Sequence, residues 1–435
     1  MEILDLLARE YVELTLIKHA WHDPWDVYWL ADSPFWKRTE LSVNRYSSVY
    51  PYKPMPPQNE MTLPDILAQA RVLQDDLLRL KGRCSGNDAL RLGYLIEHNR
   101  ALITRVLHLL GEKLSYNEYC LGMFGLKAPQ TEEGRLEEML GRLNDVLPSG
   151  GSLASRIEDF RNRIRIPVDR IPAVMNQAAR FFHDMAVENM GVKDGNMPRL
   201  RYLHLGNKEF VTVLFGYDYD EISLEQNFSR DYPYYLDTLR EIAGHELEPG
   251  HFTFMNLRTK GMVDTGYVEL GLNSHSPSGS FIEGGARIAI ELSLDTPEKE
   301  RVFDEELFAL AGADSGLIDC MPVWRQFVWL SNYGKLEIER NLWDSVWDRE
   351  QALAYAKRWC ILPPDAAETA VLSLAEDEAI SPPTTIAAMW YALIIMAASQ
   401  VRKKNGRLIP DSASDHSPWP VSQTGALTPL LLKIE

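Results

Sequence analysis

The spacing of apolar residues limits most of this chain to helices. Through much of the first 190 residues, apolar side chains recur at intervals of three and four, as in the opening stretch DLLAREYVELTLIKHAW. Pro64 stands where a helix is expected to begin, and Gly82 stands where the same helix is expected to end. We expect further helices over residues 153–164 and 171–190. The sequence therefore predicts a mainly α fold.

The period of the pattern changes near residue 200. Between Arg201 and Phe228, polar and apolar residues alternate, and β-branched and aromatic side chains are frequent. This pattern predicts a small β element around residues 201–228, with two or three short strands and a Gly-Asn turn. Helical spacing returns at Tyr234.

The chain has no repeat, low-complexity tract or convincing linker before residue 190. We therefore expect a single large domain over residues 1–405. Its helical N-terminal half covers residues 1–195, its second half covers residues 196–405, and a polar tail occupies residues 406–435.

The composition is globular and acidic. The 435 residues are 45% hydrophobic, which provides enough apolar area for a sizeable core, and the formal net charge is −17. An acidic surface repels phosphate backbones and anionic lipids, so we expect neither nucleic acid nor a membrane as a partner. A small molecule or a peptide remains the expected partner.

The ends and the cysteines favour a cytoplasmic protein. The N-terminal segment carries acids where a signal peptide has bases followed by an unbroken apolar run. The most apolar later stretch, Ile386–Ser399, is shorter than the roughly 20 residues that a membrane-spanning helix needs. The cysteines are far apart and form no C-x-x-C pair, as is typical of ordinary buried thiols. They are Cys84, Cys120, Cys320 and Cys360.

The stretch GHELEPGH, from Gly244 to His251, contains the residues of a candidate metal site. In the usual zinc-hydrolase motif, H-E-x-x-H, two histidines one helical turn apart bind the metal, and the glutamate takes a proton from its water. Here His245 and His251 are six positions apart, and Glu246 follows the first of them. On a straight helix, six positions leave two side chains roughly 120° apart, too far for one ion.

Pro249 and Gly250 provide a way to interrupt that helix. Proline removes a backbone donor and disrupts the turn before it, whereas glycine adopts backbone angles closed to other residues. We therefore expect a bulge or loosened turn that swings His251 back over His245.

A hydrolytic zinc site needs a third protein ligand and an open position for water. Glu283 is the best candidate, because it lies 32 residues after His251 at the start of a further predicted helix, FIEGGARIAIELSL. Gly284 and Gly285 would let two helices approach closely, and a carboxylate among apolar neighbours requires a metal or a cationic partner.

Other interpretations of the cluster remain. His275 and His204 are alternative ligands. In a competing interpretation the histidines gather by chance, and Glu248 is only a solvated acid.

The two motifs together resemble the DUF885 family of bacterial proteins. The family's usual text, close to HEAYPGHHLQ and then EGWALY, corresponds here to HELEPGHFTF and EGGARI. The resemblance implies a mostly helical, zincin-like metallopeptidase. It also implies that His245, His251 and Glu283 bind zinc or another divalent metal and that Glu246 is the general base.

The chain departs from that family around the site. Phe254 stands where the family commonly has Gln, Gly285 replaces its Trp, and Arg287 with Ile288 replaces Leu-Tyr. Met389 occupies the place of a tyrosine in a C-terminal segment of the family. These changes indicate a divergent branch with an altered pocket.

The sequence thus predicts an enzyme that uses zinc to hydrolyse peptide or other amide bonds. The oxyanion of the reaction has four candidate partners, which are Tyr267, His275, Arg287 and Tyr391. Two alternatives stay open. One is a His/His/Glu enzyme of another reaction class that uses iron or manganese, and the other is a catalytically eroded protein that binds a ligand.

Overall fold

The computed structural model describes most of the chain up to Trp359. The described residues are 2–22, 27–29, 61–125, 127–128, 130, 133–148, 150–190, 197–203, 211–218, 221–229, 233–253, 265–274, 277, 286, 289–290, 293–294 and 296–359. The expected tail at 406–435 and the expected Gly-Asn turn at 206–207 lie outside them.

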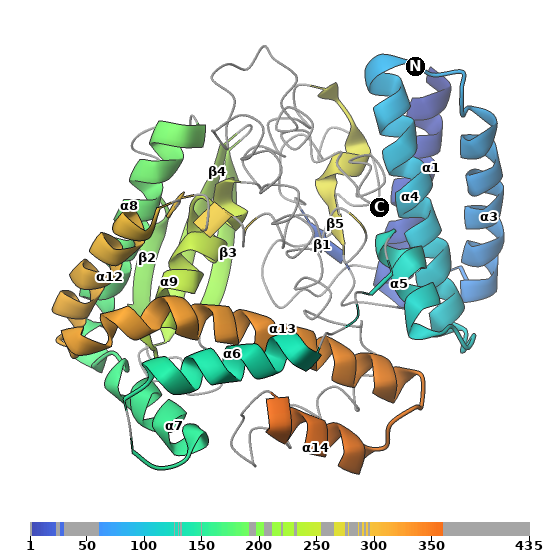
Figure 1. The fold of residues 1–435 in the computed structure, drawn as a ribbon. Helices are drawn as coiled ribbons and strands as arrows, with labels where there is room; N and C mark the ends of the chain where they lie inside the picture. Colours follow the sequence, from blue (N-terminus) through green and yellow to red (C-terminus); the bar gives the residue numbers. More distant parts are fainter. Residues whose placement is uncertain are drawn as a thin grey trace.

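Helices from the N-terminal part of the chain lie together on the right of Figure 1. They are α1 (Glu2–Trp21), α3 (Leu63–Arg79), α4 (Gly86–Leu109) and α5 (Tyr116–Phe124). The start of α3 is fixed by a capping box, in which the Thr62 hydroxyl accepts from the Asp65 backbone N–H and the Asp65 carboxylate accepts from that of Thr62. Gly82 follows the helix with a φ of +81°, so both ends of α3 agree with the sequence prediction.

A second group of helices crosses the lower part of Figure 1. It consists of α6 (Glu133–Val146), α7 (Leu153–Arg163), α13 (Met321–Trp343) and α14 (Arg349–Trp359). Phe160 of α7 packs on Trp324 of α13, with ring centroids 5.2 Å apart. The group therefore joins segments from both halves of the sequence.

The third part combines helices with a sheet. Beside α8 (Ile171–Met190) and α12 (Pro297–Ala311) lies a three-stranded sheet in the order β2-β4-β3 (Figure 1). β2 (Arg199–Leu203) runs parallel to β4 (Glu221–Ser229), and β3 (Val211–Asp218) runs antiparallel to it, with Thr212 opposite Asn227. A separate antiparallel pair joins β1 (Val27–Trp29) to β5 (Leu272–Ser274).

These elements confirm the predicted mainly α fold. The three strands of the sheet match the β element expected around residues 201–228, and the helices expected at 153–164 and 171–190 correspond to α7 and α8. Among the described helices, none is both long and apolar enough to cross a membrane.

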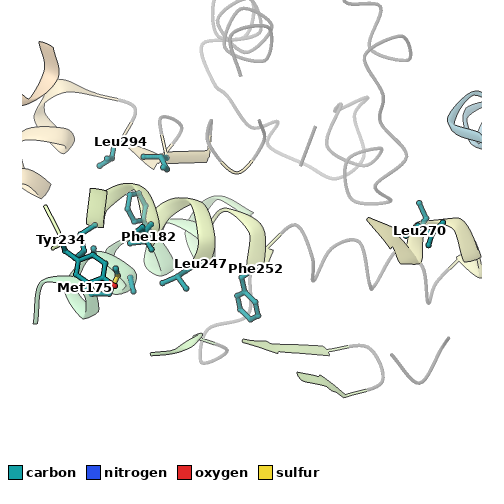
Figure 2. Packing of buried hydrophobic residues seen from close by; sticks show 14 of the residues in the cluster. Met175, Phe182, Tyr234, Leu247, Phe252, Leu270 and Leu294 are labelled. Carbon is teal, nitrogen blue, oxygen red and sulfur yellow. The ribbon is translucent and has the colours of Figure 1, made fainter. Parts of the chain in front are cut away.

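A large buried apolar cluster extends through most of these elements. Figure 2 labels part of it, namely Met175, Phe182, Tyr234, Leu247, Phe252, Leu270 and Leu294. Leu247 lies within the stretch GHELEPGH and Phe252 directly after it, so this stretch packs into the core. That position argues against a chance cluster on a surface loop.

A buried ion pair ties α4 to the segment that follows the motif. Arg91 is 3% exposed and Glu269, in the short helix η4 (Val268–Gly271), is 1% exposed. The guanidinium donates from Nε to Oε1 at 2.6 Å and from Nη2 to Oε2 at 3.1 Å. Arg91 also pairs with Asp5 of α1, and it lies 4.0 Å from the ring centre of Tyr267. This bidentate arrangement compensates for the cost of burying both charges.

We predict that Glu269→Ala lowers the free energy of unfolding by roughly 3 kcal/mol, because it leaves the buried Arg91 guanidinium without its main partner. Urea denaturation followed by circular dichroism measures the change. The control is Asp76→Ala, which breaks an exposed pair with Arg79 and should cost less than about 1 kcal/mol. Equal losses in the two variants would show that burial of the first pair has no special effect.

Candidate metal centre

The first half of the motif comes directly after helix α9 (Leu236–Ile242) in the chain. The helix continues into η3 (Ala243–Leu247), a π-helical turn whose hydrogen bonds span one residue more than those of an α-helix. Glu248 then takes an extended conformation, with φ −112° and ψ 143°. Residues 248–250 form a turn, in which the Glu248–Pro249 peptide bond is cis, and helical structure resumes at His251. The predicted interruption of the helix is therefore present.

The interruption brings the two histidine rings into contact. The ring centroids of His245 and His251 lie 4.5 Å apart, and the ring planes are nearly perpendicular at 84°. A straight helix would have left these side chains roughly 120° apart around its axis. The prediction that the turn swings His251 back over His245 is confirmed.

Gly250 is needed for close approach and not for an unusual backbone angle. Its φ lies outside the left-handed region, which corrects the sequence argument. A Cβ at this position would lie 1.9 Å from the carbonyl oxygen of His245 and 2.5 Å from that of Gly244. The turn therefore folds directly onto the backbone of the first histidine, and only glycine leaves room for it.

Gly244, the residue before His245, permits a second close contact. A Cβ at Gly244 would lie 2.5 Å from Cγ1 of Ile290 and 3.1 Å from Cζ of Phe182. Ile290 belongs to the second predicted motif helix, where the backbone N–H of Leu294 donates to the carbonyl of Ile290 at 3.0 Å. The described residues of this segment are thus helical near Ile290, and Ile290 packs against Gly244.

Glu248 is a buried residue, and its interpretation as a solvated acid is wrong. It is 2% exposed and shares a hydrogen bond with Nδ1 of His183, which lies on α8 and is 3% exposed. Burial raises the pKa of Glu248, whereas the hydrogen bond and charge of His183 act in the opposite direction. No local pattern marks this pair, because 65 positions separate the two residues.

The other predicted site residues divide into described and undescribed positions. Glu246 lies next to His245 and is half-buried. Tyr267 packs on Arg91, and Figure 2 draws the nearby Leu270 well apart from Leu247. The remaining candidates lie outside the described residues, and they are His204, Phe254, His275, Glu283, Gly284, Gly285, Arg287, Ile288, Met389 and Tyr391.

The donor set fits a metal ion in part. Within the described ranges, no group of three or more His, Cys, Asp or Glu side chains is assembled as a metal site. Two imidazoles in contact can share one ion, because zinc–nitrogen bonds are about 2.0–2.1 Å long. The described residues therefore provide two of the three expected ligands, and Glu246 is the next residue in the chain after the first of them.

Comparisons with known proteins do not assign this chain to a family. No family model matches it. No curated protein matches it. A solved structure described as a "putative lipoprotein from Colwellia psychrerythraea" is similar over 85% of this chain and 68% of its own, with 11% identity and a TM-score of 0.48. A likeness this distant carries no argument about function, and the DUF885 resemblance stays a prediction.

We predict that Gly250→Ala destabilises the protein by roughly 2–3 kcal/mol, because the added methyl group collides with backbone atoms that cannot move independently. The matched control is Gly141→Ala on α6, where a Cβ would meet nothing within 4 Å. That change should stabilise the helix by about 0.5–1 kcal/mol. Thermal unfolding of both variants checks the prediction, and a neutral Gly250→Ala would contradict the close approach.

Proposed function

We propose that this protein is a metal-dependent hydrolase, with zinc as the expected ion and a peptide or other amide as the substrate. The observation that supports it best is the contact between His245 and His251 across an interrupted helix. A π-helical turn and a glycine that admits no side chain are both needed for this contact. Such departures from regular helix are frequent at functional sites.

Glu283 is the proposed third ligand. It precedes Ile290 by seven positions, which is the spacing of residues on one helix face, and Ile290 packs beside Gly244. On the helix that the sequence predicts for this segment, Glu283 would therefore share the face of Ile290. The DUF885 resemblance, on different grounds, points to the same three ligands.

Glu246 is the proposed general base. When bound, a zinc ion lowers the pKa of a water molecule and polarises the substrate carbonyl. The Glu246 carboxylate, one residue after His245, then accepts the proton of the attacking water and returns it to the leaving amine. The half-buried position of Glu246 leaves the carboxylate accessible to water while keeping it beside the first ligand.

We predict that His251→Ala removes most metal binding and that Glu246→Gln keeps it. Protein purified without added metal, then equilibrated with zinc, should hold about one ion per chain in the wild type and far less in His251→Ala. The control is His108→Ala, since His108 stacks on Trp343 in another part of the fold. Unchanged zinc content in His251→Ala would disprove the site.

The base is tested separately by activity. Hydrolysis of a library of peptides and simple amides should fall by about 10²–10⁴-fold in Glu246→Gln, because an amide side chain cannot take the proton of the attacking water. The zinc content of this variant should equal that of the wild type. Full activity in Glu246→Gln with zinc still bound would remove Glu246 from the mechanism.

A further inference from the structure

The His183–Glu248 pair lies where the chain turns between the two candidate ligands. Glu248 is the first residue of the turn, three positions after His245 and three before His251. Its partner comes from α8, a helix of the N-terminal half. Both side chains are almost completely buried.

Glu248 is the one residue of this turn that can make a directional side-chain bond. Pro249 and Gly250, the other two turn residues, have no polar side chain, and both are buried. A carboxylate removed from water is costly unless a partner satisfies it, so Glu248 must remain beside His183. The direction of the turn is therefore tied to α8 through this hydrogen bond.

α8 also contacts the start of the motif. Phe182, the residue before His183, lies against Gly244, where a Cβ would be 3.1 Å from its ring. Neighbouring residues of α8 thus hold the backbone on both sides of His245, one by packing and the other by a hydrogen bond. A shift of either contact would move His251 relative to His245.

We propose that the His183–Glu248 pair is a positioning device, which anchors the turn at 248–250 to α8 and so holds the ring of His251 against that of His245. The pair acts through His251 and is not itself a metal ligand. Its consequence for metal binding rests on the function proposed above, whereas its effect on the ring contact is tested separately.

The ring contact can be measured directly in the metal-free protein. In protein with ¹³C-labelled histidine, rings at 84° and 4.5 Å should give a nuclear Overhauser effect between their protons and a ring-current shift of the edge protons. Assignments come from His245→Gln and His251→Gln. Zinc affinity is then measured by competition with a chelating dye, and thermal unfolding reports stability.

Three variants separate positioning from stability. Glu248→Gln keeps an acceptor for His183, so it should retain the ring contact. Glu248→Met removes the acceptor. The double variant His183→Phe with Glu248→Met replaces both polar groups by apolar ones of similar size, which can restore stability without restoring the bond. Glu339→Gln is the matched control, because Glu339 is also a buried carboxylate and is bonded to Tyr116.

We predict that Glu248→Met and the double variant lose the ring contact and bind zinc at least about tenfold more weakly, as is typical when groups supporting a ligand are removed. Glu248→Gln and Glu339→Gln should keep both properties. If Glu248→Met does not fold, the double variant decides the question.

Two results would overturn the inference: a double variant that keeps the ring contact, or a wild type in which the two rings give no contact signal. If the wild type shows the ring contact and the variants lose it, but the wild type binds no zinc, the positioning role would be supported and the proposed function rejected. If the double variant loses the ring contact but binds zinc as tightly as the wild type, the effect of the pair on metal binding would be rejected and its effect on the ring contact would stand.

Discussion

The close approach of Gly250 to the carbonyl oxygen of His245 is the constraint on which the candidate site depends. At 1.9 Å from a carbonyl oxygen, no side-chain carbon fits, so the turn can fold back only with glycine at this position. The fold-back brings His251 over His245 although the two are six positions apart. Gly244, the residue before His245, leaves room for the side chains of Ile290 and Phe182. Gly250 thus packs against the backbone of the first histidine, and Gly244, directly before it, packs against side chains of other segments.

Local rules were sufficient to predict the helices and the interruption of the motif. Helical spacing and caps such as Thr62 depend on residues within one turn of each other, so they can be recognised in a single sequence. The alternation after Arg201 likewise marked the strands. Within the motif, Pro249 with Gly250 predicts a break, because proline disrupts a regular helix interior and glycine weakens it.

Tertiary contacts determined what could not be predicted. Glu248 reads as a surface acid beside other acids, and only the packing of α8 shows that it is buried against His183. The prediction that Gly250 adopts unusual backbone angles is likewise wrong. The sequence cannot show that a carbonyl oxygen occupies the place where a side chain would begin. The pairing of Arg91 with Glu269 spans 178 positions and left no local pattern.

The two buried pairs, Arg91–Glu269 and His183–Glu248, both connect the N-terminal half of the chain to the segment around the motif. Buried polar and ionic pairs contribute little net stability compared with apolar groups of the same volume, although the loss of one partner is costly. Their benefit is therefore directional, since a hydrogen bond fixes an orientation that apolar packing leaves variable. For the turn at Glu248 this orientation matters, because a small rotation there would separate His251 from His245 and leave neither histidine able to share an ion with the other.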